Sequence, residues 1–319
     1  MSSPRQPFRQ VPAKLTRSIL QRTLRYTKAR YLADPNVVAI GIGTKFTARE
    51  STGNHRSIQF FVRQKIPHQD LGVDRLPNYI IARGPKNALL RPLRIATDVI
   101  SVGHVEAVCG AGARVLSLGQ GGVATLMFRD KGAPHGDSFL LTCAHVVGSV
   151  HAPVARDLTS GCDLATVPFA RPVAMAKVEA GTLEYDVALA KVLRPLADNE
   201  DMVLDGTSIR LRSLLSRQDV RPPARYSCRF PVSHTSNGQV ASSFGTVQVT
   251  YDSADCLVEN AFVLQAPILP GDSGGLIYAG NSAVGIAFAR SPDGWTWFHA
   301  LGDALSYAIK LYGQPIRCL

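Results

Sequence analysis

Short apolar runs, each bounded by Gly, Pro, Asn or Asp, recur along most of the chain. Runs of this kind at regular spacing predict β-strands, and many of them in succession favour a sandwich or barrel. The first two runs, 37–42 and 58–62, flank a polar stretch and predict a hairpin with a long loop. One stretch near the end of the chain, 301–311, has the pattern of a helix instead. The predicted strands are 37–42, 58–62, 97–103, 123–128, 139–143, 187–192, 245–250, 261–265, 275–278 and 283–289.

A second helical pattern lies near the start of the chain, in 14–32, which contains neither Pro nor Gly. On a helical wheel, one half collects the apolar side chains and the other half the basic ones. Such a helix either packs on its own protein with a solvated basic face, or docks on an anionic surface of lipid, nucleic acid or a partner. The apolar half holds Leu15, Ile19, Leu20, Leu24, Tyr26 and Tyr31, and the basic half holds Lys14, Arg17, Arg22, Arg25 and Lys28.

The positive charge of the chain is concentrated at its start. Of a formal net charge of +11, residues 1–36 contribute +7, which leaves +4 for everything that follows. A protein that grips nucleic acid more often spreads basic residues over its main domain, so we expect no nucleic acid to be required for the chemistry. The hydrophobic fraction of 45% excludes a disordered chain, and no apolar run is long enough to span a membrane.

The length of 319 residues allows two domains or one domain with an extension. We divide the chain into a basic leader (1–36), a small α+β or β subdomain (37–108) and an all-β domain (109–319). Within the last, the polar stretch 196–206 separates a first half, about 109–195, from a second half, about 207–319.

The six cysteines form no CxxC pair and no spacing typical of zinc ligands. In a chain of this length they favour buried thiols over a disulfide framework. The basic N-terminus is followed by no apolar stretch of the kind that a secretory signal needs. These features predict a reducing, cytoplasmic location.

The most informative residues are Gly-Asp-Ser-Gly-Gly at 271–275. A serine on a tight turn between glycines exposes its hydroxyl and lets backbone N–H groups converge on one point. A serine hydroxyl needs a general base, and that base needs an orienting acid. His145 directly follows one predicted strand and Asp186 begins another, so both partners are present. Taken singly, each also fits a structural role. His145 could be a core histidine whose hydrogen bonds are satisfied, Asp186 a carboxylate that caps a strand, and 271–275 a structural turn.

Thr-Cys-Ala-His (142–145), Asp-Val-Ala-Leu-Ala (186–190) and Gly-Asp-Ser-Gly-Gly (271–275), in this order, resemble the signature segments of trypsin-like (chymotrypsin-fold) serine proteases. The resemblance covers about 109–319. Patterns in 37–103 are similar to the leader that precedes the protease in some intracellular bacterial and plant members. The family implies an all-β fold of two antiparallel six-stranded β-barrels, with the site in the cleft between them and a C-terminal helix.

The resemblance implies a role for each matching residue. Ser273 attacks the scissile carbonyl, His145 takes and then delivers the proton, and Asp186 orients the imidazole. Backbone N–H groups of Gly271 and Ser273 hold the oxyanion. No cofactor or metal is implied, and the partner is a protein or peptide substrate.

Several positions depart from the family pattern. The digestive enzymes have a cysteine just after the histidine, whereas Cys143 precedes His145 here. No Ile-Val-Gly-Gly segment is available to supply the N-terminus that pairs with the aspartate before the serine, so Asp272 needs another partner. The position that holds an aspartate in trypsin is Pro267, which disfavours Lys or Arg at P1. The other candidate pocket residues are Phe288 and Ala289, which suit an apolar or small side chain, and Arg290, which either admits an acidic one or is solvated.

The sequence therefore predicts a serine endopeptidase that works through an acyl-enzyme intermediate. The alternative is a catalytically silent protein of the same fold that binds or scaffolds, with the basic leader as a membrane, nucleic-acid or partner anchor. The sequence indicates neither the physiological substrate, nor the activation mechanism, nor the oligomeric state.

Overall fold

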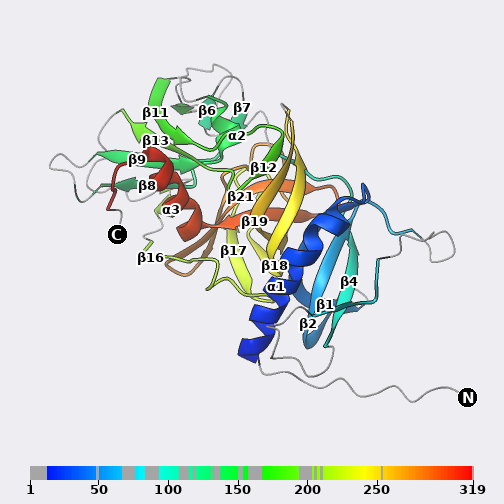
Figure 1. Cartoon of the computed structure of the whole chain (residues 1–319). Coiled ribbons are helices and arrows are strands. Elements are labelled where there is room, and N and C mark those ends of the chain that lie inside the picture. Colours follow the sequence, from blue (N-terminus) through cyan, green and yellow to red (C-terminus); the bar gives the residue numbers. More distant parts are fainter. Residues whose placement is uncertain are drawn as a thin grey trace, which may run out of the picture.

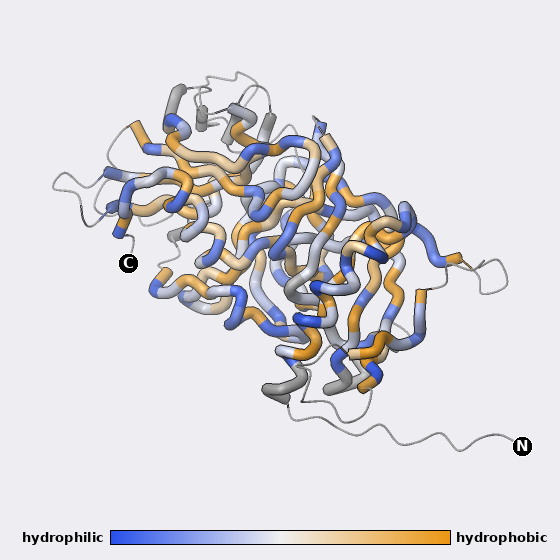
Figure 2. The backbone as a smooth tube through the Cα atoms, viewed as in Figure 1, coloured by the Kyte–Doolittle hydropathy of each residue, from blue (hydrophilic) through white to orange (hydrophobic). Residues whose placement is uncertain are grey.

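The described part of the protein is mostly β, with two large sheets, one two-stranded sheet and three helices, of which the longest has 20 residues (Figure 1). This computed structural model describes residues 13–47, 50–66, 76–82, 93–107, 115–117, 120–130, 132, 137–149, 154–156, 167–193, 203–204, 207–208, 211–252 and 254–317. Hydrophobic stretches follow the strands in the middle of the molecule (Figure 2). The prediction of an all-β fold is confirmed.

The smaller sheet is formed by the first part of the predicted all-β domain. Within the described residues it has seven strands, and all neighbours in it are antiparallel. Two neighbouring strands, 138–142 and 188–192, are buried at all but one position. In spatial order the strands are β7 (Gln120–Gly122), β6 (Val115–Ser117), β10 (Val154–Arg156), β11 (Val167–Met175), β13 (Ala188–Val192), β9 (Ser138–Thr142) and β8 (Leu126–Arg129).

Six strands of the larger sheet form a closed ring in which each is hydrogen-bonded to two antiparallel neighbours. One cluster of buried apolar side chains receives residues from all six, as expected when alternate residues of each strand point into a barrel. In ring order the strands are β17 (Arg225–Arg229), β18 (Asn237–Thr250), β19 (Asp255–Gln265), β22 (Trp295–Ala300), β21 (Ser282–Ser291) and β20 (Leu276–Ala279).

The N-terminal strands extend this larger sheet. β1 (Val37–Thr47) pairs with β18, and β2 (Glu50–Val62) folds back on β1, so the predicted hairpin is confirmed. The predicted long loop is wrong, because both strands continue through it until Thr47 pairs with Glu50. β4 (Arg94–Ser101) adds parallel to β2, and β3 (Tyr79–Ile81) adds antiparallel to β4. Gly43 permits the close approach of β1 to β18, since a Cβ there would lie 2.2 Å from the carbonyl oxygen of Ala241.

Helix α1 (Ala13–Leu32) lies along the N-terminal strands (Figure 1). Ile19, Leu20 and Leu24 are buried in one cluster with side chains of β1 and β2, which confirms the predicted apolar face. Tyr26 is an exception, because 70% of it is exposed. The helix therefore packs on its own protein. Within the described residues, no helix is long and apolar enough to cross a membrane.

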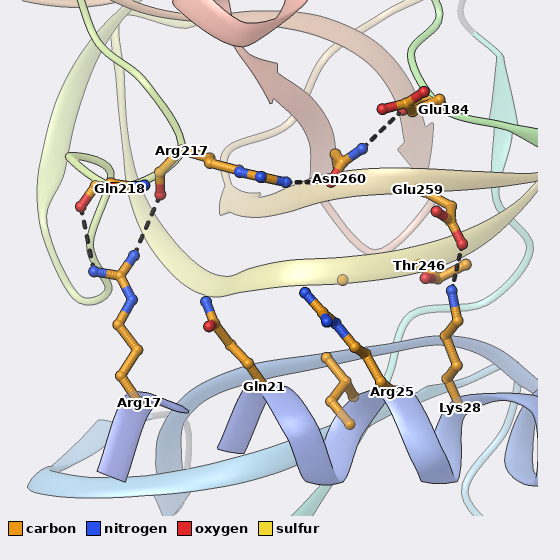
Figure 3. A pocket seen from close by; sticks show the side chains of 12 residues that line it. Arg17, Gln21, Arg25, Lys28, Glu184, Arg217, Gln218, Thr246, Glu259 and Asn260 are labelled. Carbon is orange, nitrogen blue, oxygen red and sulfur yellow. Dashed lines mark hydrogen bonds and ion pairs between the residues drawn. The ribbon is translucent and has the colours of Figure 1, made fainter. Parts of the chain in front are cut away.

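The basic face of α1 lies opposite β18 and β19 across a polar cavity of about 590 Å³ (Figure 3). Lys28 forms an ion pair with Glu259 on β19. Arg17 donates to the carbonyl oxygens of Arg217 and Gln218, each at 3.3 Å. Part of the basic face thus holds the helix to the larger sheet. Arg22, Arg25 and Arg30 are exposed.

Helix α3 (Leu301–Tyr312) confirms the second predicted helix. It directly follows β22 and contacts β21 of the larger sheet and β11 and β13 of the smaller one (Figure 1). Its buried side chains, among them Leu301 and Leu305, belong to the core cluster that runs between the two sheets. The helix therefore fixes one sheet against the other. Most of the predicted joint at 196–206 lies outside the described residues.

Candidate active site

The three side chains of the predicted site come from both sheets. His145 lies in the short helix α2 (Ala144–Val147), directly after β9. Asp186 lies two residues before β13, which pairs with β9. Ser273 lies in the turn between β19 and β20. The smaller sheet thus supplies the imidazole and the carboxylate, and the larger sheet supplies the hydroxyl.

The structure brings these three side chains into one hydrogen-bonded series. His145 Nε2 is 2.8 Å from Ser273 Oγ, and His145 Nδ1 is 2.5 Å from Asp186 Oδ2. All three residues are buried. Ser273 has no exposed surface, so the expectation of an exposed hydroxyl is wrong. The two ring nitrogens of one imidazole therefore connect a hydroxyl to a carboxylate within a site screened from water.

Several donors converge on the Asp186 carboxylate. Oδ1 accepts from the backbone N–H groups of Ala144 (2.8 Å) and His145 (3.2 Å), and Oδ2 accepts from the hydroxyl of Tyr251 (3.0 Å). Burial alone would raise the pKa of Asp186. The charge and hydrogen bonds of His145 outweigh that effect, so the pKa of Asp186 is lowered. Asp186 is therefore held as an anion.

Tyr251 was not predicted from the sequence. It follows β18 directly, and its ring lies 5.4 Å from that of His145. Burial and the neighbouring Asp186 charge raise its pKa well above the ordinary value, so its hydroxyl remains a donor. No motif marks this tyrosine, because its role depends on where the end of β18 meets the smaller sheet.

His299 contacts the backbone of Asp186, and this residue was also not predicted from the sequence. Its Nε2 lies 3.0 Å from the backbone nitrogen of Asp186 and accepts that N–H, while its Nδ1 lies 3.4 Å from the carbonyl oxygen of Asn260. The ring stacks on Phe288, with the centroids 4.3 Å apart. Burial lowers the pKa of His299 to about 4, so the ring is neutral at neutral pH.

The turn around Ser273 is tied to β21 by its backbone. Gly274 N–H donates to the carbonyl oxygen of Ala287 (2.8 Å), and Ala287 N–H donates to that of Gly275 (3.0 Å). Gly274 has a φ of +86°, and a Cβ there would lie 2.0 Å from the carbonyl oxygen of Val123. Only glycine fits both constraints. Within the described part of the chain, the N–H groups of Gly271 and Ser273 have no acceptor.

Asp272 finds its partners in the backbone. Its Oδ1 accepts from Val232 N–H at 2.8 Å, and its Oδ2 accepts from the N–H groups of Ser233 and Leu269, both at 3.0 Å. Three donors satisfy a side chain that is fully buried. The partner that the sequence analysis required for Asp272 is thus a set of backbone amides.

The four predicted pocket residues lie in different surroundings. Pro267 is exposed, and Phe288 is buried in the core against His299. Ala289 pairs with Ala107 in a neighbouring strand, and Arg290 is bound to a glutamate. The two cavities along α1 are lined by none of the four.

Cys143, His145 and Asp186 form a group of possible metal ligands, with their ligand atoms within 4.8 Å of one another. Tetrahedral zinc would hold its ligand atoms about 3.3 Å apart. The Nδ1–Oδ2 distance of 2.5 Å leaves no room for an ion between His145 and Asp186. The thiol of Cys143 is hydrogen-bonded to the carbonyl oxygen of Ala287 at 3.2 Å. The arrangement does not fit a metal site.

Three of the six cysteines can be described, and all three are buried free thiols: Cys143, Cys228 and Cys256. Burial raises the pKa of Cys228 to about 12. A thiol with so high a pKa is protonated and inert at neutral pH. The other three, Cys109, Cys162 and Cys318, lie outside the described residues.

No protein-family model matches the chain, and no curated protein matches it. Solved structures with a similar backbone include a glutamic-acid-specific serine protease that uses a histidine triad in substrate binding (18% identity, covering 65% of this chain and 98% of that one, TM-score 0.47). They also include Cellulomonas bogoriensis chymotrypsin (17%, 65% and 97%, 0.38) and an inactivated protease paralogue of the scabies mite (16%, 60% and 94%, 0.37).

All of these identities are below 20%, and all of these TM-scores are below 0.5. At these identities and scores the likeness does not extend to activity.

Proposed function

We propose that the protein is a serine endopeptidase that cleaves a protein substrate through an acyl-enzyme intermediate. The observation that carries this proposal is the series from Ser273 Oγ through the His145 ring to Asp186 Oδ2, with contacts of 2.8 and 2.5 Å. A serine hydroxyl becomes nucleophilic when a base within hydrogen-bond reach can take its proton. The base in turn needs an acid that holds its ring.

In the proposed reaction, Ser273 Oγ attacks the scissile carbonyl carbon while its proton moves to His145 Nε2. The tetrahedral intermediate collapses when that proton passes to the leaving nitrogen. The C–N bond then breaks and an ester remains on Ser273. Water attacks this ester, gives its proton to His145, and releases the acid product as Ser273 regains a proton.

Asp186 stabilises the imidazolium that forms on His145 and holds the tautomer with hydrogen on Nδ1. Its lowered pKa supports this role, because the carboxylate must be charged throughout the cycle. We assign the N–H groups of Gly271 and Ser273 to the oxyanion. Both lie in the turn that carries the nucleophile, and neither has an acceptor within the described residues.

The substrate preference follows from the resemblance to trypsin together with one residue. Pro267 stands six positions before Ser273, where trypsin has the aspartate that binds Lys or Arg. Burying a cationic side chain without a charged partner costs several kcal/mol. We therefore propose that the enzyme does not prefer Lys or Arg at P1.

The test is covalent labelling with a fluorophosphonate probe, which reacts with activated serines, together with hydrolysis of casein. Wild-type protein is expected to take up one probe at Ser273. The Ser273→Ala variant should lose the label, and turnover should fall by about six decades if the three residues act as a unit. Ser306→Ala is the matched control, because this serine is exposed on α3 and its hydroxyl donates to the carbonyl oxygen of Gly302 in the same helix.

The opposite result supports the binding or scaffold alternative. Folded wild-type protein that takes up no probe and hydrolyses no casein would be a protein of protease fold without turnover. The exposed basic residues of α1 would then be the first place to look for an anionic partner. The same experiment thus separates the two classes of function.

A further inference from the structure

A short strand that follows the N-terminal strands in the sequence lies between two strands of the larger sheet. We call the space between those two strands the slot. This strand, β5 (Glu106–Ala107), pairs with β21 on one side and with β18 on the other. On the second side, Thr250 N–H donates to the carbonyl oxygen of Val105 at 3.1 Å. β5 thus takes backbone partners from both flanking strands. An extended peptide binds to a sheet edge in the same way.

The slot leads to Ser273. Ala107 pairs with Ala289, which lies two residues, or about 7 Å, along β21 from Ala287. Ala287 is the residue whose backbone is bonded to the glycines after Ser273. Because β5 and β21 are antiparallel, the chain in β5 runs from the Arg290 end of the slot towards the nucleophile.

An ion pair in the slot joins Arg290 to Glu106. Arg290 Nη2 and Nε lie 2.7 and 3.0 Å from Glu106 Oε1, and Nη1 lies 3.5 Å from the carbonyl oxygen of Ile268. The two residues are also paired in the backbone register. A guanidinium held in this way is a fixed cationic partner for an acidic side chain at one position of a bound peptide.

We propose that the slot between β18 and β21 binds extended peptides with an acidic residue two or three positions before the cleaved bond, and that Val105–Ala107 is an internal occupant of it. Arg290 selects the acidic side chain, and a small residue follows it, as Ala107 does here. This inference rests on the proposed function for what happens at Ser273, but the binding itself does not need turnover.

Occupation from within the chain makes the segment a competitor of substrate. A tethered segment acts at an effective concentration of about a millimolar, so a peptide at micromolar concentration displaces little of it. Removing the Glu106 charge therefore makes Val105–Ala107 easier to displace from the slot and leaves Arg290 in place. Removing the Arg290 charge also makes the segment easier to displace, but it removes the preference for an acidic peptide.

The experiment measures binding of the fluorescent peptide Gly-His-Val-Glu-Ala, the sequence of residues 103–107, to the full chain carrying Ser273→Ala. Adding Glu106→Gln should tighten binding about fivefold, the effect of a partly exposed charged hydrogen bond. The matched peptide with Gln in place of Glu should bind about fivefold more weakly to that protein. Adding Arg290→Gln instead should abolish the difference between the two peptides.

Asp293→Asn is the control, because it removes an exposed negative charge from the turn between β21 and β22, outside the slot. Equal affinity of the Glu106→Gln and Asp293→Asn proteins, or equal binding of the two peptides to the Glu106→Gln protein, overturns the proposal. In the parent protein, hydrogen exchange across residues 105–107 should rise when peptide is added in excess. No change in exchange at saturation also overturns it.

Since every protein in this binding experiment lacks the Ser273 hydroxyl, its outcome does not depend on hydrolysis. Failure of fluorophosphonate labelling would contradict the proposed function and leave the peptide-binding result standing. Failure of peptide binding would remove the internal occupant and leave labelling of Ser273 unaffected. The two proposals can therefore fail separately.

Discussion

Tyr251 donates its hydroxyl hydrogen to Oδ2 of Asp186 at 3.0 Å, the same oxygen that His145 Nδ1 contacts. Tyr251 follows a strand of the larger sheet, whereas Asp186 belongs to the smaller one. The contact joins the two sheets at the one buried carboxylate of the proposed relay. We infer that Tyr251 is a positioning residue, which acts on the His145 ring through Asp186.

Tyr251→Phe removes that donor and keeps the ring. The carboxylate is then less stabilised and more basic, so it holds a proton on His145 more strongly. We expect kcat/KM to fall about tenfold, as for loss of a hydrogen bond to a charged group. The acid limb of its pH profile should move to higher pH. Tyr26→Phe, on the exposed side of α1, is the control, and an unshifted acid limb would show that Tyr251 is merely structural.

His299 makes stability depend on pH. Its pKa in the folded protein is about 4, against an ordinary value of 6.5. Between these two pH values the His299 ring is protonated in the unfolded chain and neutral in the folded protein. The free energy of unfolding therefore falls as pH falls from about 6.5 to about 4. The full effect is about 3 kcal/mol.

The His299→Gln variant should lack this contribution to the pH dependence. Urea unfolding at several pH values between 7 and 4 measures the slope for each protein. His234→Gln, which changes an exposed histidine, should keep the wild-type slope. Parallel slopes for wild type and His299→Gln would contradict the assignment of the acid sensitivity to this ring.

The sequence predicted which three side chains meet because each is tied to a local pattern. His145 directly follows an apolar strand, Asp186 precedes another, and Ser273 lies among glycines that only a tight turn explains. Local patterns place a residue at the end of an element. The resemblance to a known family then indicated that these three element ends meet in one site.

Contacts that depend on how elements meet could not be predicted in this way. Tyr251 and His299 reach Asp186 only because the ends of β18 and β22 meet the segment before β13, and no local pattern marks either residue. The partners of Asp272 are backbone amides, which carry no sequence signal at all. Glu106–Ala107 was placed at a domain boundary, whereas pairing on both sides makes it a strand.

Gly274→Ala should damage the turn that carries Ser273. The new Cβ would lie 2.0 Å from the carbonyl oxygen of Val123, and that backbone atom cannot rotate away. We expect a loss of more than about 2 kcal/mol in the free energy of unfolding, together with loss of fluorophosphonate labelling. Gly280→Ala is the matched control, because its φ is also positive (+54°) but nothing lies within 4 Å of the added Cβ. Equal effects of the two substitutions would mean that backbone strain, and not the contact with Val123, is decisive.

Leu20→Ala tests whether α1 is part of the folded body or a detachable anchor. Leu20 is 1% exposed and packs with side chains of β1 and β2. Truncating a buried leucine costs about 2–5 kcal/mol, so the urea midpoint of the whole protein should fall. Tyr26→Ala, at a position that is 70% exposed on the same helix, should leave it almost unchanged. If α1 only tethered the protein to an anionic surface, Leu20→Ala would leave the main unfolding transition where it is, because the rest of the fold would not depend on the helix.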